Sequence, residues 1–189
     1  LLLLGGWLPA LRFFANPAHY LPFHIALEFV AMAVSAMVFA LSWNLRRIED
    51  NSHAVILGTG FLAVTLIDLA HTLSFAGMPD LVTPSSPEKA INFWLAARFI
   101  AAAILLAVAL RRPAHWSPRR CLGALLAALA VSAAVWWLVL VHSAWLPRTF
   151  IPGSGLTDLK IGSEYVLALL YGLAALLLYR TALQQRQPD

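Results

Sequence analysis

Two short pairs of ionisable residues interrupt long apolar runs of this sequence. His24 is followed four positions later by Glu28, and Asp68 is followed three positions later by His71. Each spacing is about one helical turn, so each pair should project from one face of a helix. An ionisable group costs about 2.5–3.5 kcal/mol at the centre of a membrane helix, and such groups are usually paired or functional. We therefore predict that these four side chains converge on one site.

The residue types suit a divalent transition metal such as zinc, copper or iron, because imidazole and carboxylate are common ligands of these ions. A b-type haem with His24 and His71 as axial ligands is the alternative cofactor, with Glu28 and Asp68 supporting the ligands. A third alternative is a small polar or amphipathic molecule bound by Arg98 and the carboxylates. Since Arg98 also lies in an apolar run, we expect it to pair with Asp68, with Glu28 or with a bound anionic group.

The composition predicts that the chain is an integral membrane protein. Of its 189 residues 61% are hydrophobic and 12% are charged, whereas about a quarter are charged in soluble domains. The net charge of +4 comes from arginines in short loops, as membrane topology requires, so it does not indicate nucleic-acid binding. The single cysteine, Cys121, excludes an internal disulfide and a thiolate-rich metal site.

Apolar segments of about 20 residues, the length that crosses a bilayer, recur along the chain. We predict an all-α fold: one polytopic transmembrane helical bundle of about six spans over residues 1–189. The first span would be truncated, with only residues 1–14 present. The complete spans are predicted at residues 21–44, 54–76, 90–110, 119–145 and 160–180, and residues 181–189 would begin a cytoplasmic linker.

Basic residues are distributed unevenly between the two sets of loops. One side holds Arg46, Arg47, Arg111, Arg112, Arg119, Arg120, Arg180 and Arg186, and the other holds Arg12, Lys89, Arg148 and Lys160. The richer side should be cytoplasmic, so the C-terminus is predicted in the cytoplasm, beneath a bacterial inner membrane. Every ionisable residue within a span then falls in the outer half of the membrane.

The order of several motifs along residues 20–180 resembles the type-three membrane-associated sensor domains of the MASE family. The motifs are His24-x3-Glu28, Trp43-Asn44, Asp68-x2-His71, Trp94-x3-Arg98 and Lys160-x3-Glu164. We predict ligand contacts for Trp43, Asn44, Trp94, Arg98, Lys160 and Glu164. The resemblance implies an input module followed by a cytoplasmic output, such as a histidine kinase or a diguanylate cyclase, which makes cyclic di-GMP. It also implies a homodimer, because a diguanylate cyclase needs two subunits.

We predict, then, a sensor domain that binds a metal or a small ligand near the outer face and regulates a fused output domain. The rival hypothesis is an intramembrane metal-dependent hydrolase, in which Glu28 would act as the base for a metal-bound water. The sequence contains no Gly-x-Ser-x-Gly and no Cys-x-x-Cys motif, and the inner half of each span consists almost entirely of Ala, Leu and Val. These observations favour a sensor over an enzyme.

Overall fold

The computed structural model describes residues 20–186, and five long helices account for most of them. They are α2 (Tyr20–Asn44), α3 (Ser52–Leu73), α4 (Pro87–Leu110), α5 (Pro118–Val141) and α6 (Asp158–Arg186). All five are long and apolar enough to cross a membrane, which confirms the predicted helical bundle. The truncated span predicted at residues 1–14 lies outside the described residues.

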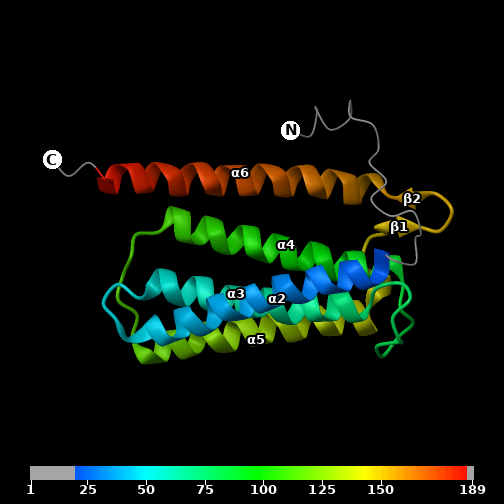
Figure 1. Ribbon diagram of the computed structural model, residues 1–189, viewed down its shortest axis with the longest axis horizontal. Helices are drawn as coiled ribbons and strands as arrows, with labels where there is room; N and C mark the ends of the chain where they lie inside the picture. The colour runs from blue at the N-terminus through cyan, green and yellow to red at the C-terminus, as the bar shows by residue number, and fades with distance from the viewer. Residues whose placement is uncertain (1–19, 187–189) are drawn as a thin grey trace.

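The helices lie side by side, and successive helices run in opposite directions (Figure 1). Helix α3 is central and packs against α2, α4 and α5, whereas α6 packs principally against α4 at the edge of the bundle. Two short 3-10 helices, η2 (Leu45–Arg47) and η3 (Ser143–Trp145), follow α2 and α5. The all-α prediction missed a small hairpin before α6, in which β1 (Phe150–Ile151) pairs with β2 (Gly155–Leu156).

Several helices depart by a few residues from their predicted limits. Helix α4 begins at Pro87, because Ser86 caps it by accepting a hydrogen bond from the Lys89 amide at 3.2 Å, and proline suits a first helical position. Helix α5 ends at Val141 instead of residue 145. The chain then tightens into η3, and Pro147 favours the extended conformation of the preceding Leu146, so no helix continues beyond Trp145. Helix α6 continues to residue 186, so most of the predicted linker is helical.

Small residues allow the central helix to approach its neighbours closely. A Cβ atom added at Gly58 of α3 would lie 2.6 Å from the Cβ of Ser42 on α2. One added at Gly60 would lie 2.5 Å from the side chain of Ile104 on α4. Close approach of this kind is the main source of helix association in a membrane, where van der Waals packing replaces the hydrophobic effect.

We expect Gly58→Ala to lower the free energy of unfolding by about 1–3 kcal/mol, because the added methyl group forces α2 and α3 apart. The measurement is an SDS titration of the protein in detergent micelles, followed by circular dichroism. Gly172→Ala is the matched control, since nothing lies within 4 Å of a Cβ added there. The control should be neutral or slightly stabilising. Equal losses in both variants would mean that the α2–α3 contact is not tight.

Candidate metal centre and buried ion pair

Three of the four predicted metal ligands lie together at one end of the bundle. His24 and Glu28, in the first turns of α2, face His71, in the last turn of α3. One ligand atom from each residue lies within 4.8 Å of the other two. A tetrahedral zinc ion with bonds of about 2.1 Å holds its ligand atoms about 3.4 Å apart. Small side-chain movements would therefore bring all three onto one ion.

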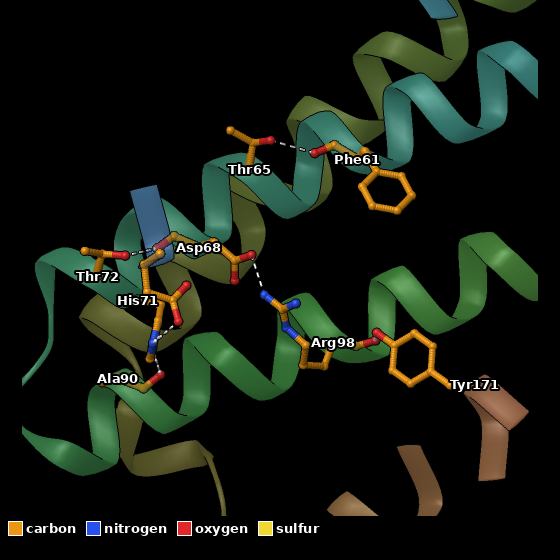
Figure 2. A network of polar contacts seen from close by, with 9 residues as sticks. Phe61, Thr65, Asp68, His71, Thr72, Ala90, Arg98 and Tyr171 are labelled. Carbon is orange, nitrogen blue, oxygen red and sulfur yellow. Dashed lines mark hydrogen bonds and ion pairs between the residues drawn. The ribbon is translucent and has the colours of Figure 1, made fainter. Parts of the chain in front are cut away.

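His71 is held in the orientation that a metal ligand requires. Its Nδ1 lies 2.8 Å from the carbonyl oxygen of Ala90 on α4 (Figure 2). A carbonyl only accepts, so Nδ1 carries a proton, and the nitrogen that a neutral His71 ring offers to a metal is Nε2. That Nε2 is buried, has no hydrogen-bond partner among the described residues and lies 3.8 Å from a carboxylate oxygen of Glu28. Proteins fix metal-binding histidines through the same kind of bond from the opposite ring nitrogen.

His24 completes the group from the neighbouring helix. Its Nε2 is also buried without a hydrogen-bond partner in the part of the chain that the structure describes. Its ring centroid lies 5.7 Å from that of His71, with the two rings nearly perpendicular. Phe75, 4.5 Å from the His24 ring, and Tyr20, stacked at 5.5 Å, form an aromatic wall. Two imidazoles and one carboxylate make a donor set that fits zinc, copper or iron.

Asp68 does not join these ligands, which corrects the four-residue metal site predicted from the sequence. Its Oδ2 accepts a hydrogen bond from Nη2 of Arg98 on α4, and the two form a close ion pair (Figure 2). Residues three positions apart differ in direction by about 60° around a helix. Asp68 therefore faces α4, whereas His71 reaches the ligands from α2. The prediction that a carboxylate pairs with Arg98 is confirmed, and that carboxylate is Asp68.

The backbone of Arg98 also contacts α6. The Tyr171 hydroxyl of α6 donates a hydrogen bond of 3.0 Å to the backbone carbonyl of Arg98 (Figure 2). Sequence reasoning missed Tyr171, although a tyrosine in the middle of an apolar helix is a signal that its hydroxyl has a partner. Arg98 itself lies about three turns into α4, deeper than predicted, because the helix already begins at Pro87. One residue of α4 thus contacts both α3 and α6.

Four of the six predicted ligand contacts lie together between α4 and α6. Trp94 is one turn before Arg98, whose Cζ atom is 5.9 Å from the centroid of the indole ring. Lys160 of α6 places its Nζ 4.3 Å from the same ring and pairs with Glu164 one turn further along. This group is distinct from the metal ligands, which lie between α2 and α3.

Trp43 and Asn44, the other two predicted ligand contacts, lie at the other end of α2, and the structure does not bring them together with the first four. The helix rises about 1.5 Å per residue, which puts Trp43 about 28 Å from His24 along the axis. There the Asn44 side chain donates to the Ala40 carbonyl at 2.8 Å, and the Arg46 guanidinium lies 4.7 Å from the Trp43 ring. These are local contacts at the end of a helix.

Comparison with known proteins agrees with this architecture. Residues 15–189 match the family MASE3, described as a membrane-associated sensor domain. No curated protein and no solved structure matches the chain. The family match covers nearly the whole sequence and includes all five described helices. The protein is a multi-pass membrane protein, and it belongs to the MASE3 family of membrane-associated sensor domains.

Proposed function

We propose that this chain is the sensory input module of a signalling protein and that it senses a divalent transition metal through His24, Glu28 and His71. Membership of the sensor family supports the sensory role. The observation that carries the metal assignment is the meeting of three ligand atoms within 4.8 Å. The bond from His71 to the Ala90 carbonyl supports it, because it directs the free ring nitrogen toward the other two ligands.

A small ion fits this site better than a haem. A haem with two axial histidines places its macrocycle between their Nε2 atoms. The carboxylate of Glu28 lies within 4.8 Å of a ring nitrogen of each histidine, so a charged group would stand close to the apolar macrocycle. When bound, the metal supplies positive charge that draws the three ligands together. Zinc, copper and iron(II) all accept two imidazoles and a carboxylate.

We further propose that the signal passes from the metal ligands to α6. Metal binding favours the arrangement in which α2 and the end of α3 are closest, and a ligand shifts such an equilibrium only through unequal affinity for the two states. His71 is one helical turn from Asp68, which forms an ion pair with Arg98. The carbonyl of Arg98 in turn accepts a hydrogen bond from Tyr171 of α6. Helix α6 would then lead into a cytoplasmic output, a diguanylate cyclase or a histidine kinase, in a homodimer at the bacterial inner membrane.

The test is to join the chain at its C-terminus to a diguanylate cyclase domain and to measure cyclic di-GMP formation in membranes. Output should change at least about fivefold when zinc is added after chelation, because the coupling energies of allosteric sites are typically 1–3 kcal/mol. His71→Ala should be unresponsive, whereas His142→Ala, at the same end of the bundle, should respond like the parent. Equal responses in all three proteins would overturn the proposed site. Hydrolytic turnover by the membrane domain alone would instead support the enzyme hypothesis.

A further inference from the structure

A second site lies between α4 and α6, away from the metal ligands. The structure has a cavity of about 450 Å³ there, within the range of about 300–1,000 Å³ that is usual for small-molecule sites. Its lining combines the ion-paired residues with aromatic and apolar side chains. The lining residues are Trp94, Arg98, Ile161, Glu164, Tyr165, Leu167, Ala168 and Tyr171.

The guanidinium of Arg98 lines this cavity and has more hydrogen-bond donors than Asp68 can accept from. It has five N–H groups, and among the described residues only Asp68 accepts from its side chain, through Nη2. Its Nε is buried without a hydrogen-bond partner in residues 20–186, so the N–H groups left to meet an occupant are the remaining ones on the two Nη atoms. The Arg98 side chain is still 28% exposed, although the residue lies about halfway along a membrane span. Unsatisfied donors at that depth are costly in free energy. We therefore expect the occupant of the cavity to carry an oxygen atom that accepts hydrogen bonds from Arg98.

The charges around the cavity favour a neutral occupant. Asp68 already balances Arg98, and Glu164 already balances Lys160. An additional carboxylate would bring an uncompensated negative charge into the membrane, whereas a carbonyl oxygen accepts hydrogen bonds without one. The head of the occupant should therefore be neutral and carry carbonyl groups.

The residues that line the cavity, and their exposure, indicate what the rest of the occupant is. Trp94, Tyr165 and Tyr171 present aromatic surfaces, against which a planar ring packs well. Tyr165 and Ala168 are exposed on α6, a helix whose outer face meets lipid, so the cavity can be entered from the bilayer. The occupant is then a planar, apolar molecule that is dissolved in the membrane.

We propose that this cavity binds a membrane quinone, with one carbonyl oxygen accepting from Arg98 and the apolar tail extending into the bilayer. A quinone combines the planar ring, the neutral charge, the acceptor oxygens and the lipid solubility that the site requires. The proposal does not rest on the metal centre. Because the cavity lies between α4 and α6, its occupant would contact both the last helix and its principal neighbour.

The test uses the whole chain in lipid nanodiscs and decylubiquinone as the probe. Quinones quench tryptophan fluorescence on contact, so binding beside Trp94 adds a saturable component to the non-saturable quenching from the lipid. Ala168→Phe fills the cavity and should abolish the saturable component. Ala175→Phe is the matched control: it makes the same change at an exposed position of the same helix that does not line the cavity.

A second variant tests the role of the guanidinium. Arg98→Lys keeps the charge that Asp68 needs but loses the forked set of donors, so it should weaken decylubiquinone binding at least about tenfold. Its far-ultraviolet circular dichroism and its metal binding should match the parent. Identical quenching in the parent and in Ala168→Phe would overturn the cavity as the site. A saturable site for decanoate but not for decylubiquinone would overturn the choice of a quinone.

Discussion

Replacing Arg98 with leucine should lower the free energy of unfolding by about 3–5 kcal/mol, the usual loss when one partner of a buried ion pair is removed. The Asp68 side chain is only 2% exposed, and one of its oxygens already lacks a hydrogen-bond partner within residues 20–186. Without Arg98, this carboxylate would have to ionise unpaired or take up a proton inside the membrane. An SDS titration in detergent micelles measures the loss.

A double-mutant cycle separates the pair from its surroundings. Asp68→Leu alone should also destabilise the protein, whereas Asp68→Leu with Arg98→Leu should recover much of the loss, because no charge remains buried. The control pair is Arg148 with Glu88, which lie 3.4 Å apart in an exposed position. Arg148→Leu should cost no more than about 1 kcal/mol, as for other surface ion pairs. A variant Arg98→Leu as stable as the parent would show that the ion pair makes no net contribution.

The second large effect concerns metal affinity. We expect the purified chain to bind one divalent ion and His24→Ala to weaken that binding at least about 100-fold. Loss of a residue that merely supports a metal ligand already costs about 10–100-fold. Elemental analysis gives the stoichiometry, a zinc titration against a competing chelator gives the affinity, and a visible spectrum reveals any haem.

A variant of a second ligand and a control variant make the metal-binding test specific. Glu28→Gln keeps the size of the side chain but removes its negative charge, so it should also weaken zinc binding. His115→Ala is the control, since His115 is exposed in the loop before α5, at the opposite end of the bundle. Affinity that falls equally in His115→Ala and His24→Ala would indicate non-specific binding to surface histidines. A strong absorption band of haem would replace the metal assignment.

The pairs His24-x3-Glu28 and Asp68-x2-His71 show what the sequence can and cannot predict. Depth in the membrane follows from position within a span, and the structure does put these residues near one end of the bundle. The partners of each side chain depend on how α3 is rotated between its neighbours. All the spans are similarly apolar, so the sequence contains little information on that rotation. For this reason the sequence predicts Asp68 among the metal ligands, whereas the structure pairs it with Arg98.

The sequence predicts the limits of helices better than it predicts contacts between distant residues. Apolar runs and flanking turn residues predicted the five described helices to within a few residues, because each limit depends on local chemistry such as the proline at the start of α4. The bond from Tyr171 to the Arg98 carbonyl joins residues 73 positions apart. This contact depends on which face of α6 packs against α4, and the packing of side chains between the two helices determines that face. The expectation for Trp43 and Asn44 rests on the family resemblance alone, which carries no information about depth in the membrane.

The peripheral position of α6 also has a consequence for biosynthesis. Helix α6 has 29 residues and is the last described element to be made. At about 5–20 residues per second, the ribosome needs roughly 1.5–6 s to synthesise it. All three proposed metal ligands precede it in the chain, and none of the helices that carry them packs principally against it. We therefore expect the newly made protein to complete its ligand cluster first and to dock its last helix onto α4 afterwards.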